Sequence, residues 1–344
     1  MRPGLRKPLR PQPIPNVREP NLVSKLCIRT AIDDQRGFSD GRIVYEKRIN
    51  PYEDVLNYRE RGEIIQVMTF GRFKISVYNH GFFRLDGGAM FGTVPKTIWS
   101  RRIPADPENC IRLATRSLLI DAGERIFMAD VGYGDKWPDR LRWIYGFENL
   151  SNQETGFNSD AITDIVLTHL HFDHAGGISR YQPGSETDLE LCYPRARVYL
   201  QADNYENARN PNLRERASYL EENVLILERA RLVLTHGSQE IYPGLWVHQV
   251  NGHTRGQQWL EVKNGAESVV FPADLIPTSH HLSLPYSMGY DISAGTLLEE
   301  KEDFLNRAVA HHWIVVFEHD PDIPAARLKM DEKGHCVLQE VVEF

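Results

Sequence analysis

Cysteines and long apolar runs are scarce in this sequence, and both absences narrow the class of protein. The four cysteines, at positions 27, 110, 192 and 336, lie far apart and form no C-x-x-C pair. We therefore do not expect a disulfide framework or a cysteine zinc site, and reduced thiols in the cytoplasm are the simpler expectation. The chain lacks a run of eighteen or more apolar residues, and its basic start has no apolar signal core. We expect neither a membrane span nor a secretory signal.

The net charge of −7 is unevenly distributed along the chain. Residues 1–50 hold eleven Lys and Arg against five Asp and Glu, so the remainder is strongly acidic. An acidic body argues against nucleic acid as the main partner. Because six prolines fall within the first twenty residues, we expect residues 1–62 to form an irregular extension before one domain at residues 63–344. Such a basic arm is solvated or packs against a sister subunit, and the second case predicts a homodimer.

The hydrophobic pattern predicts strands and helices of ordinary length, which is typical of an α/β protein. We expect strands at residues 64–70, 73–78, 116–123, 125–130, 165–167, 197–201, 232–235, 245–250, 268–274, 313–317 and 337–344. We expect helices at residues 51–61, 212–231 and 297–311, and a helix with a loop within residues 135–163. The Gly-rich segment 86–92 reads as a loop, and it lacks the Lys-Ser/Thr pair of a nucleotide-binding P-loop.

One short stretch carries a dense set of metal-binding side chains. Residues 169–174 read HLHFDH, so His169, His171, Asp173 and His174 fall within six positions. Imidazole nitrogens and carboxylate oxygens are the ligands of zinc and similar metals. A helical site would place its histidines four residues apart, whereas the spacing of two favours extended or loop backbone. The apolar run before the motif and the two glycines after it predict a strand that opens into a metal-binding loop.

Polar residues stand at the carboxyl ends of other predicted strands as well. They are Asp130, His253, Asp274 and His319. Taken alone, His253 is equally well explained as a residue that caps a turn, Asp274 as a helix cap and His319 as a surface residue. Strand ends that lie side by side bring such residues together, which is a common way to build a site in α/β folds. After the HLHFDH motif, the interpretation as metal ligands is favoured for the set.

The order of these motifs resembles the metallo-β-lactamase superfamily over roughly residues 65–320. The resemblance implies a four-layer αββα sandwich with a site at one edge of two mixed sheets. It implies that His169, His171 and His253 hold one metal, that Asp173, His174 and His319 hold a second, and that Asp274 bridges both. Asp130 matches an aspartate of the family that orients or supports the ligands.

Several positions bear on the branch of the superfamily. The oxygen-reducing flavodiiron branch has the pattern H-x-E, with Glu at the position of His171. The histidine here therefore favours hydrolysis over redox chemistry. True β-lactamases lack the bridging aspartate that Asp274 supplies, and the chain shows no basic insertion like that of the tRNA-processing branch. Residues 86–96 are similar to the opening segment of N-acyl-homoserine lactonases and methyl parathion hydrolase. A tyrosine that aids some lactonases is replaced by Pro277, and Tyr286 or Tyr290 could take its place.

The sequence thus predicts a hydrolase with two divalent metal ions per chain, zinc first and manganese, iron or cobalt as alternatives. A hydroxide shared by the metals would attack an ester, a lactone or a related small molecule. Asp173 and Asp274 are the candidate catalytic residues, and Asp173 is a candidate proton shuttle besides its ligand role. Residues around Met90, Phe91, Trp99 and 282–290 line a pocket or belong to the core. Two alternatives stay open: a phosphodiesterase or thioesterase with the same site, and a non-catalytic metal-binding or interaction protein.

Overall fold

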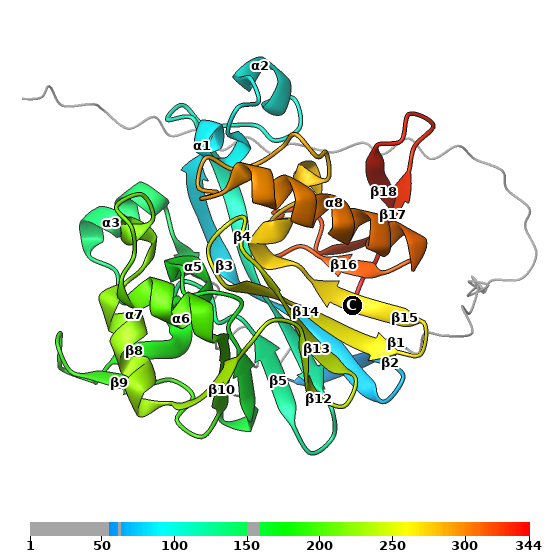
Figure 1. Cartoon of the computed structure of the whole chain (residues 1–344). Coiled ribbons are helices and arrows are strands. Elements are labelled where there is room, and N and C mark those ends of the chain that lie inside the picture. Colours follow the sequence, from blue (N-terminus) through cyan, green and yellow to red (C-terminus); the bar gives the residue numbers. More distant parts are fainter. Residues whose placement is uncertain (1–54, 61–62, 150–158) are drawn as a thin grey trace, which may run out of the picture. The chain divides into compact units, whose positions relative to one another are not determined.

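Two β-sheets pack face to face in the computed structural model, which describes residues 55–60, 63–149 and 159–344 (Figure 1). The described strands of the first sheet follow the order β1-β2-β3-β4-β5-β7-β10-β11, with β6 beside β3. Their bounds are β1 Val55–Glu60, β2 Glu63–Phe70, β3 Phe73–Asp86, β4 Cys110–Asp121, β5 Ile126–Ala129, β6 Glu148–Asn149, β7 Asp164–Val166, β10 Arg197–Gln201 and β11 Arg231–Thr235. Strands β1 to β5 pair antiparallel, whereas β5, β7, β10 and β11 pair parallel.

The second sheet has the strand order β12-β13-β14-β15-β16-β17-β18. Its strands are β12 Gln239–Tyr242, β13 Leu245–Val250, β14 Gln257–Asn264, β15 Glu267–Phe271, β16 Ile314–Val316, β17 Ala325–Met330 and β18 Cys336–Val341. Only β15 and β16 pair parallel within this sheet. A separate hairpin joins β8 Ser179–Tyr181 to β9 Leu189–Leu191.

Helices cover the outer faces of both sheets (Figure 1). The described α-helices are α1 Gly87–Phe91, α2 Lys96–Trp99, α3 Asp139–Tyr145, α5 Phe172–Ala175, α6 Ala202–Arg209, α7 Glu221–Leu225 and α8 Ala294–Ala310. Helix α8 packs Leu297 and Phe304 against the second sheet, where they join Val315 in one buried cluster. On the other side, Ala208 of α6 and other residues of that layer pack against the first sheet. The layer order is therefore αββα, which confirms the predicted fold class.

The core between the sheets draws its side chains from both of them. Ile75 and Phe127 from the first sheet and Leu260 and Phe271 from the second are fully buried in the same cluster. Burial of this apolar surface on both inner faces is the main force that holds the sheets together. It also fixes how the carboxyl ends of β5, β7, β15 and β16 lie relative to one another, and the polar residues discussed below follow these ends.

Three predicted elements differ in the structure. The helix expected at residues 51–61 is wrong where the structure describes it, because β1 pairs antiparallel with β2. The loop expected at residues 86–92 contains α1, whose first turn is capped by the Asp86 side chain accepting from the N–H of Ala89 at 2.8 Å. The helix expected at residues 212–231 is broken into the 3₁₀ turns Arg216–Ser218 and Ile226–Arg229 with α7 between them.

The predicted boundary at residues 62 and 63 stays a prediction, because residues 1–54 and 61–62 lie outside the described part of the chain. Among the described residues, no helix is long and apolar enough to cross a membrane.

Candidate metal centre

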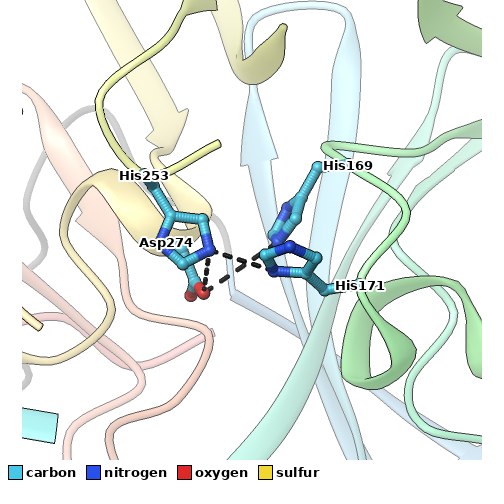
Figure 2. A group of neighbouring side chains, drawn as sticks. All are labelled: His169, His171, His253 and Asp274. Atoms are coloured by element: carbon cyan, nitrogen blue, oxygen red, sulfur yellow. Dashed lines mark hydrogen bonds and ion pairs between the residues drawn. The ribbon is translucent and has the colours of Figure 1, made fainter. Parts of the chain in front are cut away.

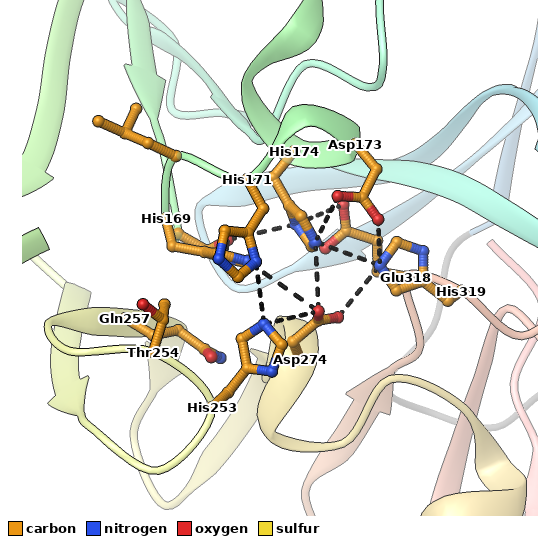
Figure 3. A network of polar contacts seen from close by, with 12 residues as sticks. His169, His171, Asp173, His174, His253, Thr254, Gln257, Asp274, Glu318 and His319 are labelled. Carbon is orange, nitrogen blue, oxygen red and sulfur yellow. Dashed lines mark hydrogen bonds and ion pairs between the residues drawn. The ribbon is translucent and has the colours of Figure 1, made fainter. Parts of the chain in front are cut away.

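The HLHFDH motif follows β7 and changes backbone conformation in its middle. His171 is extended, with φ −64° and ψ 156°, and it directly precedes the short helix α5. Asp173 and His174 lie within α5. The extended part points His169 and His171 to one side, and the helical turn presents Asp173 and His174 beside them (Figure 3). The strand and the site were predicted, whereas the short helix within the motif was not.

The first group of candidate ligands consists of His169, His171, His253 and Asp274 (Figure 2). One ligand atom from each lies within 4.8 Å of the others, and all four residues are buried. Nε2 of His253 is 3.1 Å from Nδ1 of His171 and 3.1 Å from Oδ2 of Asp274. His253 comes from the loop after β13, and Asp274 lies in a 3₁₀ turn after β15.

The second group consists of Asp173, His174 and His319, which are also buried and within 4.8 Å of one another. Nε2 of His319 lies 3.2 Å from Nε2 of His174 and 3.1 Å from Oδ1 of Asp274. Oδ2 of Asp274 also lies 3.6 Å from Nε2 of His174, so the carboxylate of Asp274 stands between the two groups (Figure 3). The structure brings all seven residues that the sequence pointed to into one place.

The outward ring nitrogens of both histidines in the second group are held by the protein. Nδ1 of His174 is 3.0 Å from Oδ2 of Asp130, and Nδ1 of His319 is 2.8 Å from the carbonyl oxygen of Ala114. Asp130 is itself fixed, because it accepts from the N–H and the hydroxyl of Thr168 at 2.7 and 2.6 Å. Such contacts orient an imidazole so that its other nitrogen is free to bind a metal.

The ring nitrogens and carboxylate oxygens that face one another show whether the seven candidate ligands fit a metal. When the outward Nδ1 atoms of His174 and His319 donate, their Nε2 atoms carry lone pairs that face each other at 3.2 Å. Two such lone pairs repel unless a positive charge, a proton or a metal ion, lies beside them. Nε2 of His169 and Oδ1 of Asp274 are buried and make no hydrogen bond within the described residues. Divalent cations would satisfy these atoms, so the residues fit the metal that the family resemblance implies.

The pKa values of the candidate ligands also favour a bound cation. Burial lowers the pKa of His169 and His171 well below the usual value, and neighbouring histidines add to this effect. Burial opposes charge on Asp274, but His253, His174 and His319 keep its pKa well below the usual value. Burial likewise opposes charge on His319, but Asp274 raises the pKa of His319 to about 9. The pocket thus combines neutral imidazoles and an anionic carboxylate with a preference for added positive charge.

Sequence analysis missed two buried carboxylates that lie within hydrogen-bond distance of candidate ligand histidines. Glu318 lies 3.1 Å from Nδ1 of His174, and burial raises the pKa of Glu318 to about 8. Asp291 lies 2.9 Å from Nδ1 of His253. The sequence could have pointed to Glu318, because it stands between a predicted buried strand and His319. Asp291 could not be recognised in this way, because it lies in a loop with no periodic pattern.

A cavity of about 170 Å³ opens beside the two groups. Apolar and aromatic side chains form most of its lining, and Arg214 is the cationic side chain among them. Met90 and Tyr290, which the sequence suggested for a pocket, line this cavity. Phe91 and Trp99 instead stack on each other in the buried core, with ring centres 5.4 Å apart.

Comparisons with known sequences agree with this geometry. A model of the metallo-beta-lactamase superfamily matches residues 111–319. N-acyl homoserine lactonase of Bacillus cereus is 25% identical over 195 residues, which are 55% of this chain and 65% of the relative. N-acyl homoserine lactonase of a Bacillus species is 25% identical over 173 residues, 49% of this chain and 60% of that relative. The chain therefore spans less than two thirds of the length of these curated relatives.

Solved structures share the fold. A probable metal-dependent hydrolase from Staphylococcus aureus is 26% identical with a TM-score of 0.70, and the match covers 80% of this chain and 100% of that one. A dizinc quorum-quenching lactonase, solved with a product bound, is 20% identical with a TM-score of 0.65, covering 81% of this chain and 98% of its own. Because the superfamily model matches more than half of the sequence, over the part that carries the clustered histidines and aspartates, the chain belongs to the metallo-beta-lactamase superfamily.

Proposed function

We propose that the protein is a metal-dependent hydrolase with two divalent ions at this centre. His169, His171 and His253 would hold one ion, and Asp173, His174 and His319 would hold the other. The observation that carries the proposal is the position of Asp274, whose two oxygens each lie 3.1 Å from a histidine of a different group. A carboxylate in this place is suited to bind both ions at once.

When bound, the ions would activate a water for attack near neutral pH and polarise the substrate oxygen. The chain supplies the remaining functions. Asp173 lines the cavity and lies 3.7 Å from Nε2 of His319, so its carboxylate can hold a proton between the centre and a leaving group. Asp274 keeps the two histidine groups in fixed relation. The apolar side chains around the cavity exclude water from the rest of the substrate.

The cavity supports an ester or lactone with an apolar acyl part as the substrate class. Most lining side chains are hydrophobic or aromatic, which suits an alkyl or acyl chain. A phosphodiester or a nucleic acid would call for several cationic contacts, whereas the described lining offers Arg214. The N-acyl homoserine lactonases among the relatives support the same class.

Tyr290 is the proposed partner for the carbonyl oxygen of the substrate. Pro277 occupies the position where some lactonases have a tyrosine, and Tyr290 lines the cavity whereas Tyr286 does not. Burial raises the pKa of the Tyr290 phenol, so its hydroxyl stays protonated and able to donate throughout the working pH range.

Zinc is the proposed metal, because imidazole and carboxylate oxygen suit it, and manganese, iron or cobalt can occupy similar sites. A small molecule is the proposed partner at the site. The predicted homodimer and the cytoplasmic location stay predictions.

A substrate panel on the metal-loaded full chain tests the proposed function. It comprises an acyl-homoserine lactone, an aryl ester, an aryl thioester, an aryl phosphotriester and a phosphodiester. Turnover of the lactone or the ester that disappears with a chelator and returns with zinc supports the proposal. Turnover of only the phosphodiester or only the thioester would move the function to that class of hydrolase. Bound metal without turnover of any member would favour a non-catalytic binding protein.

A further inference from the structure

Asp291 lies between the candidate ligand His253 and the wall of the cavity. Its Oδ1 is 2.9 Å from Nδ1 of His253, and its Oδ2 accepts from the backbone N–H of Met288 at 2.6 Å. Asp291 is 4% exposed, and Met288 lines the cavity. One buried carboxylate thus contacts both the metal centre and the place where a substrate would lie.

We propose that Asp291 is a positioning residue with two functions: it sets the ring of His253 for metal binding and holds the Met288 wall of the cavity. The proposal rests on the proposed function, because it takes His253 as a metal ligand. With Nδ1–H donated to Asp291, the Nε2 atom of His253 faces Asp274 with its lone pair free.

The backbone around His253 is already fixed, so the ring is what remains to be set. The carboxylate of Glu300 accepts from the N–H groups of Asn251 and Gly252 at 2.7 and 2.9 Å. The N–H of Ile292 donates to the carbonyl oxygen of His253 at 3.0 Å. These bonds tie the loop to α8 and to the segment just before it, but they leave the rotation and the tautomer of the imidazole free. Among the described contacts, Asp291 is the one at Nδ1 of His253.

The segment before Asp291 is anchored independently. The buried ammonium of Lys301 donates to the carbonyl oxygens of Ser283 and Tyr286 at 2.8 and 2.6 Å. The N–H of Gly289 donates to the carbonyl oxygen of Ala89 at 2.6 Å, which joins the segment to α1. The chain on both sides of Met288 is therefore held in place by hydrogen bonds, and Asp291 connects this segment of the cavity wall to His253.

Only a group with an acceptor on each side can make both contacts, because two N–H donors converge on Asp291. A carboxylate meets this demand, whereas the amide of Asn offers one acceptor and one donor. In Asp291→Asn the amide either turns its NH₂ toward His253 or turns it toward the N–H of Met288. The first orientation favours the tautomer with a proton on Nε2, which blocks metal binding, and the second disturbs the cavity wall.

The test is a metal titration of the full-length chain carrying Asp291→Asn, by competition with a chromophoric chelator. We expect one of two bound zinc ions to bind about 10- to 100-fold more weakly, as for other lost partners of ligand histidines, while the second keeps its affinity. If the amide turns the other way, zinc affinity should instead stay near the wild-type value and the KM for the lactone or ester should rise, because the Met288 wall then loses its bond. The matched control is Glu261→Gln, since buried Glu261 is 2.9 Å from Nε2 of His248, outside both ligand groups.

The possible results separate this inference from the proposed function. Two zinc ions at wild-type affinity together with a wild-type KM in Asp291→Asn would overturn the role of Asp291 and leave the proposed function standing. Equal weakening in Glu261→Gln would also overturn it, because the loss would then be general. A wild-type chain that binds no metal would overturn both proposals.

If Asp291→Asn does not fold, the ¹⁵N spectrum of histidine-labelled, zinc-loaded wild-type protein decides. A His253 ring with its proton on Nδ1 and zinc on Nε2 supports the proposal. The opposite arrangement, with zinc on Nδ1, overturns it.

Discussion

Oδ2 of Asp274 lies 3.1 Å from Nε2 of His253, and Oδ1 of the same carboxylate lies 3.1 Å from Nε2 of His319. The two histidines come from loops after β13 and β16 of the second sheet, while the other histidines of the centre come from the segment after β7 of the first. Asp274 therefore joins residues from both sheets at one edge of the sandwich. The account of the protein as a dinuclear hydrolase depends on this arrangement.

Tyr290→Phe tests the proposed contact with the substrate carbonyl. Loss of the hydroxyl should lower kcat/KM for a lactone about 10- to 100-fold, because one hydrogen bond to developing charge is lost. Metal content should stay at the wild-type value. The matched control is Tyr286→Phe, since Tyr286 packs edge-on against Phe91 with ring centres 6.0 Å apart and does not line the cavity. Equal losses in both variants would remove the special role of Tyr290.

Gly252→Ala tests how closely the loop of His253 must approach α8. A Cβ at this position would lie 2.3 Å from Cα of Leu297 and 2.4 Å from its backbone nitrogen, which flexible side chains cannot relieve. We expect the variant to lose about 1–3 kcal/mol of unfolding free energy and to bind metal more weakly, because the loop must shift. Gly295→Ala on the same helix is the control, since nothing lies within 4 Å of its Cβ position. Wild-type metal affinity and stability in Gly252→Ala would contradict the packing argument.

We predict that the buried His281 makes the free energy of unfolding smaller in acid. Burial lowers the pKa of His281 to about 3, and its ring lies 2.8 Å from the carbonyl oxygen of Met90 and 2.7 Å from the hydroxyl of Thr278. The unfolded chain takes up this proton near pH 6.5, whereas the folded chain does so only near pH 3. The unfolded state therefore binds more protons in this window, and stability falls as pH decreases from 6.5 toward 3.

The size of this effect follows from the width of the window. At pH 5 the contribution of His281 amounts to about 2 kcal/mol lost relative to pH 7. Denaturant unfolding of metal-free wild type and His281→Gln at pH 7 and pH 5 checks it. The variant starts less stable because it loses packing on Phe91, but its stability should fall less on acidification. Parallel losses in the two proteins would show that His281 is not the group responsible.

The candidate ligands were predictable because their signals are local. The HLHFDH motif is a cluster in the sequence itself, and His253, Asp274 and His319 each follow a short apolar run that becomes a strand. Strand ends at one edge of the sandwich then bring them together. Strand β13 matches its predicted bounds, 245–250, because a buried strand leaves a clear pattern of apolar residues.

The failed prediction at residues 212–231 has a physical cause, since tertiary contacts overrode local preference. In residues 212–231, Leu213 points to solvent with 84% exposure although the pattern placed it on a buried helix face. The carboxylate of Glu215 instead turns inward and accepts from Thr254 at 2.8 Å and from Asn207 at 2.9 Å. Side chains of this segment thus build the surroundings of the metal centre. Asp291 escaped notice for the same reason, because its importance comes from contacts with residues far away in the sequence.

The metal content of the purified chain, measured together with that of Asp274→Ala, tests the central claim most directly. We predict two zinc ions per wild-type chain, lactone or ester turnover that a chelator abolishes and zinc restores, and at most one ion in the variant with turnover lost. The variant removes the carboxylate that faces both histidine groups, so the second ion loses a ligand and its position. A wild-type chain without bound metal after reconstitution with zinc, or an Asp274→Ala variant that keeps two ions and full turnover, would contradict the account.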